Sequence, residues 1–168
     1  MFAQLNGGYL RTRVWKAWSR LVAYQLFEGR PLTTRGRWIN PMLYYLFRII
    51  KRLPQLVRVS APIFILGTGR SGTTILGVVL SMHKDVGFLN EPKALWHFIR
   101  SDEDLIGSYS RGEGRYRLTA DDARAETCDT SRKIYVAYLR LSGSRRLVDK
   151  SPELIFSVPF VRALFPDA

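Results

Sequence analysis

The residues best suited to chemistry lie in one glycine-rich loop, residues 67–74, which reads GTGRSGTT. Gly67 and Gly72 have the spacing of the G-x-x-x-x-G loop that binds nucleotide phosphates, but Thr73 stands where that loop has a lysine. The cation that the loop offers instead is Arg70, and hydroxyl groups follow it on Ser71, Thr73 and Thr74. Main-chain N–H groups in such a turn, together with the positive end of the following helix, can hold an oxyanion without a lysine.

The missing lysine bears on which anion the loop would hold. A nucleoside triphosphatase uses that lysine on the outer phosphates and a neighbouring hydroxyl on Mg²⁺. A transferable sulfuryl group carries less negative charge than a terminal phosphoryl group, so one or two protein cations could serve it without a metal. The loop therefore favours sulfate, and a degenerate P-loop kinase or NTPase is the alternative.

Short apolar strands and helices alternate around this loop. Strands are predicted at 63–66, 86–89 and 146–149, and helices at 72–82, from 120 onwards, at 134–141 and from 151 to 165, whereas 101–117 reads as a surface loop. This alternation predicts an α/β fold with a parallel sheet. The ligand site should then lie beyond the carboxyl ends of the strands, where the glycine-rich loop, the segment NEPK (90–93) and Lys150 are expected.

The first 60 residues differ in charge from the rest of the chain. They hold 11 Lys or Arg and the single acid Glu28, whereas residues 61–168 hold 15 basic and 13 acidic residues. We therefore separate a basic helical extension, 1–60, from a domain at 61–168. No motif of a nucleic-acid-binding protein accompanies the charge, so we expect no nucleic-acid partner.

Two basic amphipathic helices are predicted in the extension. The first has a face made of Leu10, Val14, Trp18 and Leu21, with Arg11, Arg13, Lys16 and Arg20 mostly off it; the second has a face made of Leu43, Leu46, Phe47, Ile50 and Leu53, with Arg48, Lys51 and Arg52 on the other side. Such helices suit peripheral contact with a membrane surface. They could equally pack on the domain and extend their arginines into water.

Targeting signals and cysteine content indicate the cellular compartment in which the protein is expected. No apolar run reaches the roughly 20 residues needed to span a bilayer, and the N-terminus has no signal-peptide core. Cys128 is alone, so no internal disulfide can form, which fits a reducing compartment. We expect a cytoplasmic protein, with a peripheral position at the inner face of a membrane as an option.

Three segments resemble the sulfotransferase superfamily. The run PIFILGTGRSGTTIL resembles its cofactor-binding loop, HKDVGFLNEPKALW is similar to the segment after its first helix, and LVDKSPELIFSVPFVRALFPDA is similar to its K-[ST]-P … FP-[DN]-A stretch. The resemblance covers about 62–100 and 145–168. It implies a P-loop-like fold and transfer of a sulfuryl group from 3'-phosphoadenosine 5'-phosphosulfate (PAPS) to a hydroxyl or amine, without a metal.

The resemblance also implies roles for individual residues. Arg70 matches the basic residue that contacts the 5'-phosphate and the sulfonate, and the rest of the cradle matches Gly69, Ser71, Gly72, Thr73 and Thr74. Glu91 falls at the position where the tyrosylprotein branch of the superfamily has a carboxylate that deprotonates the acceptor hydroxyl. Lys150 falls where that branch has a lysine near the oxygen that bridges the sulfuryl group and the 5'-phosphate of PAPS. From the residues alone, Glu91 could instead pair with Lys93 or cap a helix, and Lys150 could pair with Asp149 or Glu153.

One expected part of the family pattern has no match in these 168 residues. Members bind the 3'-phosphate of PAPS through an Arg and a Ser in a strand and helix that would come after FPDA, residues 165–168. The resemblance therefore implies the N-terminal part of a longer enzyme, an incomplete domain that is inactive alone. From another functional class, a non-catalytic protein that binds membrane surfaces through its basic extension remains an alternative.

Overall fold

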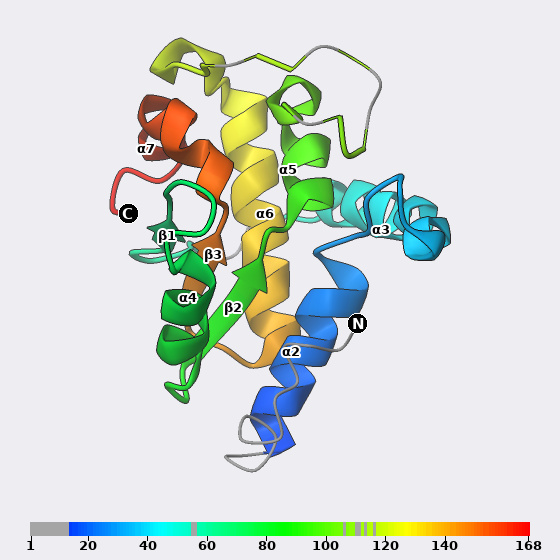
Figure 1. Ribbon diagram of the computed structural model, residues 1–168, viewed down its shortest axis with the longest axis vertical. Coiled ribbons are helices and arrows are strands. Elements are labelled where there is room, and N and C mark those ends of the chain that lie inside the picture. Colours follow the sequence, from blue (N-terminus) through cyan, green and yellow to red (C-terminus); the bar gives the residue numbers. More distant parts are fainter. Residues whose placement is uncertain (1–13, 55–56, 106, 110–111, 113, 116) are drawn as a thin grey trace.

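A parallel sheet of three strands forms the centre of the chain. The computed structural model describes residues 14–54, 57–105, 107–109, 112, 114–115 and 117–168 (Figure 1). The strands are β1 (Ile63–Ile65), β2 (Val86–Asn90) and β3 (Arg146–Lys150), in the order β1-β3-β2. Val148 of β3 is paired with Ile63 on one side and with Phe88 on the other. The predicted α/β class and parallel strands are thus confirmed, and the strand latest in the sequence lies in the middle.

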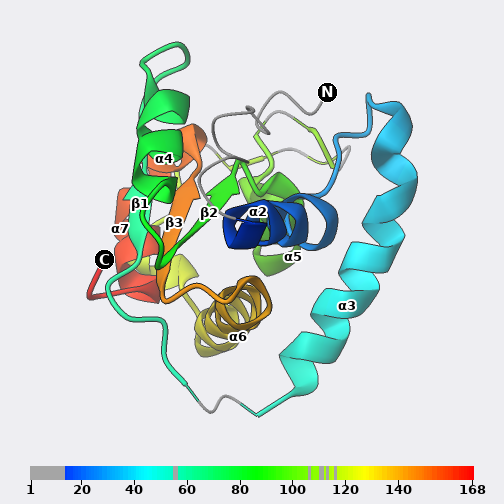
Figure 2. The same cartoon turned by 90° about the horizontal axis from the view of Figure 1, so that it is seen from below.

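Helices cover both faces of this sheet. Figure 2 places α4 on one side of the strands and α6 on the other. Under α4 the sheet presents a small apolar cluster, and the opposite face joins the main core. The α-helices are α2 (Val14–Leu26), α3 (Asn40–Arg52), α4 (Thr73–Ser81), α5 (Lys93–Ile99), α6 (Ala125–Ser142) and α7 (Val158–Leu164), and the short 3₁₀ helices are η1 (Arg35–Ile39), η2 (Ser101–Glu103), η3 (Ala120–Asp122) and η4 (Pro152–Ser157).

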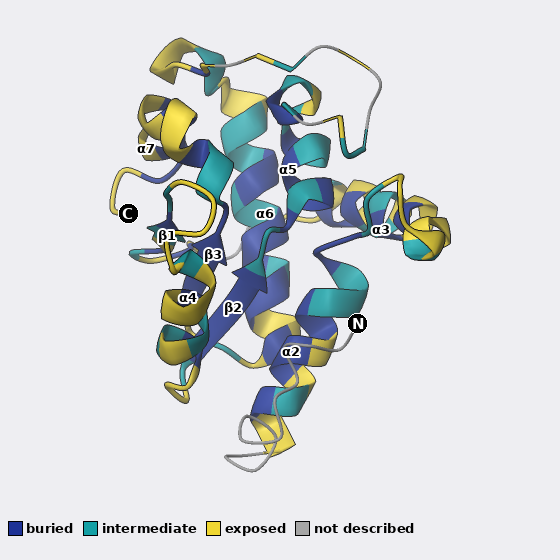
Figure 3. Ribbon diagram, viewed as in Figure 1, coloured by how far each residue is buried: buried dark blue, intermediate teal, exposed yellow. Residues whose placement is uncertain are grey.

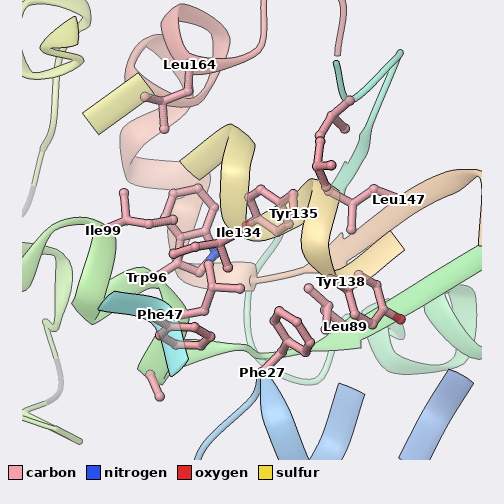
Figure 4. Packing of buried hydrophobic residues seen from close by; sticks show 14 of the residues in the cluster. Phe27, Phe47, Leu89, Trp96, Ile99, Ile134, Tyr135, Tyr138, Leu147 and Leu164 are labelled. Carbon is pink, nitrogen blue, oxygen red and sulfur yellow. The ribbon is translucent and has the colours of Figure 1, made fainter. Parts of the chain in front are cut away.

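Aromatic side chains from distant parts of the sequence fill the main core (Figure 4). Phe27 packs edge-on to Tyr138 of α6 with ring centroids 5.2 Å apart, and lies 5.9 Å from Phe47 of α3. Trp96 of α5 and Tyr135 of α6 form a second edge-on pair. Such pairs add roughly 0.5–1.5 kcal/mol each beyond their buried area. The basic extension therefore contributes to the same core as the sheet.

The region between α5 and α6 differs from the predictions. The helix predicted from residue 120 is only the three-residue η3, and α6 begins five residues later, at Ala125. The Asp122 carboxylate caps Thr119 and also pairs with Arg100 and Arg115, so this turn holds the preceding loop in place instead of starting a long helix. Within the predicted surface loop, Glu103 and Asp104 are buried.

Helix α2 does not pack on the domain through its predicted apolar face, which was one of the two alternatives for it. Val14, Trp18 and Leu21 of that face are 87, 48 and 43% exposed, whereas Lys16 and Arg20 are buried. Both cations donate to main-chain oxygens of the edge strand β2: Lys16 Nζ to Val86 at 2.6 Å and Arg20 to Phe88 at 3.3 Å. Leu10 of the predicted face, and Arg11 and Arg13 beside it, lie outside the described residues.

A buried ion pair completes this edge. Arg20 donates to both carboxylate oxygens of Glu28, and Glu28 accepts the N–H of Asn90 at 2.7 Å. Three polar groups of the β2 backbone, at residues 86, 88 and 90, thus obtain partners from α2 and the residues after it. Because unpaired backbone groups at a sheet edge invite association with other chains, this arrangement closes the edge.

Helix α3 packs as an ordinary amphipathic helix. Leu43, Phe47 and Ile50 are buried, and Arg48 and Arg52 are exposed, as predicted, but Leu53 is 52% exposed instead of buried.

Among the described residues, no helix is both long enough and apolar enough to cross a bilayer.

Candidate functional site

The glycine-rich loop connects β1 to α4 at the carboxyl edge of the sheet. Gly72, just before the first residue of α4, has a left-handed backbone with φ 80°, which disfavours a side chain there. A Cβ on Gly67 would lie 3.0 Å from Ser71 Oγ and 3.1 Å from a methyl group of Thr73, so glycine lets the loop close on itself. Ser71 Oγ donates to the Thr68 carbonyl at 2.7 Å, which leaves residues 68–72 folded as an exposed turn.

Two predicted site residues have unusual backbone conformations. Among the described non-glycine residues, positive φ occurs at Ala61, at Arg70 (66°) and at Glu91 (51°). Such conformations cost on the order of 1–3 kcal/mol each and are concentrated at active sites. Arg70 is exposed and forms no hydrogen bond or ion pair with a described residue, so its guanidinium is available to a ligand.

The structure brings Glu91 and Lys150 together. The Glu91 N–H donates to the Lys150 carbonyl at 2.8 Å, which extends the β2–β3 ladder, and the Lys150 ammonium pairs with the Glu91 carboxylate. The Lys150 side chain is 4% exposed and that of Glu91 is 41% exposed. An accessible carboxylate beside a buried ammonium therefore lies at the carboxyl ends of these strands.

A second ion pair lies beside the first. Lys93 Nζ donates to the Glu153 carboxylate at 2.7 Å. The alternative pairings considered from the sequence, Glu91 with Lys93 and Lys150 with Glu153 or Asp149, are therefore wrong, because Glu91 pairs with Lys150. The same part of the sheet edge contains a small cavity, lined by Glu91, Lys93, Trp96, Glu103, Ser151, Pro152 and Glu153. The Gly67 N–H donates to the Pro152 carbonyl at 3.4 Å, so the wall of this cavity is joined to the start of the glycine-rich loop.

Two buried carboxyl groups at this edge were not singled out from the sequence. Asp149 is fully buried and accepts hydrogen bonds from Trp96 Nε1 (3.1 Å), the Tyr135 hydroxyl (2.6 Å) and Ser151 Oγ (2.6 Å). Burial raises the pKa of Asp149 to about 6, although these hydrogen bonds oppose the rise. The network fixes the residue directly before Lys150, which positions the Lys150 side chain.

Glu103 is the other buried carboxyl group. Burial raises its pKa to about 8, with a smaller contribution from the negative charge of Glu153, and Lys93 opposes the rise. No pattern in the sequence marks Glu103, because it stands in an aperiodic polar stretch. Asp149 did offer one, since it interrupts an apolar strand.

His83 lies away from this site. It follows α4, is exposed, and its Nδ1 accepts the N–H of Asp85 at 3.3 Å. The described residues contain no group of three or more His, Cys, Asp or Glu side chains that could hold a metal ion. Arg70 makes no hydrogen bond or ion pair with Glu91 or Lys150. The loop is connected to these residues through the backbone, because Ile65 of β1 is paired with Lys150 and Gly67 donates to the Pro152 carbonyl.

Comparison with known proteins covers the same part of the chain. A sequence model described as the sulfotransferase family matches residues 62–168. The chain is also 27% identical over 118 residues to nodulation protein NoeE of Sinorhizobium fredii (strain NBRC 101917 / NGR234), a match that covers 62% of this chain and 26% of NoeE. The chain thus spans about a quarter of the length of this relative. No match was found among solved structures.

Proposed function

Because the chain belongs to the sulfotransferase family, we propose that the protein transfers a sulfuryl group from PAPS to a hydroxyl or amine of an acceptor. The observation that supports this most directly is the pairing of the Glu91 carboxylate with Lys150 at the carboxyl edge of the sheet, next to the loop that contains Arg70. A base for the acceptor and cations for the donor are the groups that this reaction needs.

The residues of the loop fit the donor. The turn at 68–72 precedes the first turn of α4, whose N–H groups and positive end favour an oxyanion. Arg70 supplies an unpaired guanidinium, and Gly69, Ser71, Gly72, Thr73 and Thr74 supply main-chain N–H groups and hydroxyls. PAPS, when bound, supplies an activated sulfuryl group whose leaving oxygen belongs to the 5'-phosphate. No metal is part of this proposal.

The acceptor side uses the paired residues. Glu91 takes the proton of the acceptor hydroxyl or amine, so that the acceptor atom can form its bond to sulfur while the bond from sulfur to the phosphate oxygen breaks. Lys150 places a positive charge where the leaving oxygen becomes negative. The hydrogen bonds to Asp149 hold the end of β3, so Asp149 is a positioning residue for Lys150.

The test is PAPS-dependent labelling of acceptors by the full-length protein. Arg70→Ala should raise the KM for PAPS, and Glu91→Gln should lower kcat by about 10²- to 10⁴-fold at similar PAPS affinity, because a positioned base contributes that much. Lys84→Ala, at an exposed turn at the other end of α4, is the matched control and should be active. Normal turnover by both site variants would overturn the proposal, and Mg²⁺-dependent ATP binding would favour the NTPase alternative.

The place of action is a further part of the proposal. Cys128 is the only cysteine of the chain, and its thiol donates to the Ala123 carbonyl at 3.4 Å. We therefore place the reaction in a reducing compartment, the cytoplasm.

A further inference from the structure

Helix α3 has a second apolar face, on the side opposite its buried residues. Trp38, at the end of η1, is 77% exposed, and Met42, Tyr45 and Ile49 are 49, 66 and 42% exposed. Their spacing of four, three and four residues aligns them along one side of the helix, away from its buried residues Leu43, Phe47 and Ile50. In Figure 2, α3 forms the outer wall of the molecule, and Figure 3 shows exposed residues on it.

The charge around this outer face has one sign. Arg48 and Arg52 border it, both are exposed, and neither forms an ion pair with a described residue. The chain contains no Asp or Glu between Glu28 and Asp85. Glu126 of α6 approaches α3 and is paired with Lys51 at 2.6 Å. The buried Asp104 acts electrostatically on the hydroxyl of Tyr44. The outer face is therefore apolar in the middle and cationic at its border.

We propose that this face, made of Trp38, Met42, Tyr45 and Ile49 with Arg48 and Arg52, rests on the surface of an anionic lipid bilayer. A helix of 13 residues is about 20 Å long and can lie in the plane of the headgroups with its apolar side chains in the acyl boundary. Trp and Tyr suit that boundary because each has an apolar ring and a polar group, and arginines beside them meet lipid phosphates.

Other exposed apolar surfaces lack this combination. On α4, Ile75 and Val79 are 71 and 55% exposed, but the helix contains no charged residue. On α2, the cations Lys16 and Arg20 are buried against β2, so they cannot reach lipid. Within the extension, α3 is therefore the described helix whose exposed cations can complement the negative charge of lipid headgroups. This proposal does not depend on sulfuryl transfer.

The experiment is flotation of the purified full-length protein with vesicles of phosphatidylcholine alone or with added phosphatidylglycerol. The protein should float with the anionic vesicles, and high salt should release it. Arg48→Gln with Arg52→Gln should weaken binding about 30-fold, since each cation near such a surface contributes roughly fivefold. Trp38→Ser with Ile49→Ser should weaken binding to anionic vesicles at least tenfold, because it removes buried apolar area.

Ile75→Ser on α4 is the matched control and should bind anionic vesicles like the unchanged protein. Each variant should keep the thermal midpoint of the parent, because all substituted side chains are exposed. Absence of binding to anionic vesicles at low salt would overturn the proposal. So would binding that the α3 variants leave intact, or a dimer in solution that forms without lipid and is lost in those variants.

Discussion

Helices α2 and α3 look alike in the sequence, and they pack in opposite ways. Both are basic and amphipathic, yet α2 buries Lys16 and Arg20 and exposes Val14 and Trp18. Helix α3 instead buries Leu43, Phe47 and Ile50 and leaves its arginines exposed. The surface that each helix meets explains the difference. Helix α2 faces the open edge of β2, whose carbonyls need donors, and α3 faces the aromatic core.

This contrast shows how a polar helix face can become the inner one. A buried carbonyl without a donor costs about 1–3 kcal/mol of folding free energy. Long cationic side chains that donate hydrogen bonds to the carbonyls of an edge strand therefore stabilise the fold. The guanidinium of Arg20 also lies over the Phe88 ring, 5.7 Å from its centroid. An amphipathic pattern therefore defines two faces of a helix, and the backbone groups of the neighbouring element decide which one is buried.

Removal of Arg20 should give the largest effect. Arg20→Met leaves the Glu28 carboxylate buried without its cation, and breaking such a pair typically costs about 3–5 kcal/mol of unfolding free energy. Urea unfolding followed by circular dichroism measures this loss. Arg48→Met on α3 is the matched control and should change stability by less than about 0.5 kcal/mol.

A second substitution tests the cause of that loss. Arg20→Met combined with Glu28→Gln removes both charges and should recover part of the stability, because the amide oxygen can still accept the Asn90 N–H. If the double variant were as unstable as the sum of the two single variants, the ion pair would not explain the packing of α2.

Glu103 sharpens the comparison, since it is a buried carboxyl group that forms no ion pair with a described residue. Its pKa is raised from 4.5 to about 8, so the folded state holds a proton that the unfolded state releases at lower pH. The resulting stability is fully present below about pH 4.5 and is lost as the pH rises through 8. Between about pH 5 and pH 7.5 the loss should be on the order of 3 kcal/mol.

Glu103→Gln isolates this contribution. The free energy of unfolding of the variant and of the unchanged protein should be measured across that pH range. As the pH rises, the variant should become more stable relative to the unchanged protein. Asp149, whose pKa is raised to about 6, acts in the same direction in both proteins and cancels in the difference. A difference that does not vary with pH would show that Glu103 is ionised in the folded protein.

Lys16 should have a smaller effect than either. Lys16→Met keeps the length and the apolar part of the side chain but leaves the Val86 carbonyl without this donor. We expect a loss of about 1–3 kcal/mol of unfolding free energy, together with faster hydrogen exchange along β2. Unchanged exchange at β2 would contradict the role of α2 in closing that edge.

Much of the site follows from the sequence, because it depends on local patterns. The three strands, the glycine-rich loop and helix α4 are set by short apolar runs and by glycine spacing, which one segment reveals on its own. The central place of β3, the Glu91–Lys150 pair and the hydrogen bonds to Asp149 depend on which strands become neighbours. The periodicity of apolar residues contains no information on which strands become neighbours. It also could not show that Lys16 would lie on the buried face of α2.

The ion pair between Lys51 of α3 and Glu126 of α6 should have the smallest effect. It is 2.6 Å long, but the two side chains are 40 and 77% exposed, so water and salt screen it. Lys51→Met should lower the free energy of unfolding less than Arg20→Met or Lys16→Met, and the loss should vanish in high salt. Because Arg20 and Lys51 pair with the same kind of group, a much larger loss at Lys51 would mean that burial is not what separates the two helices.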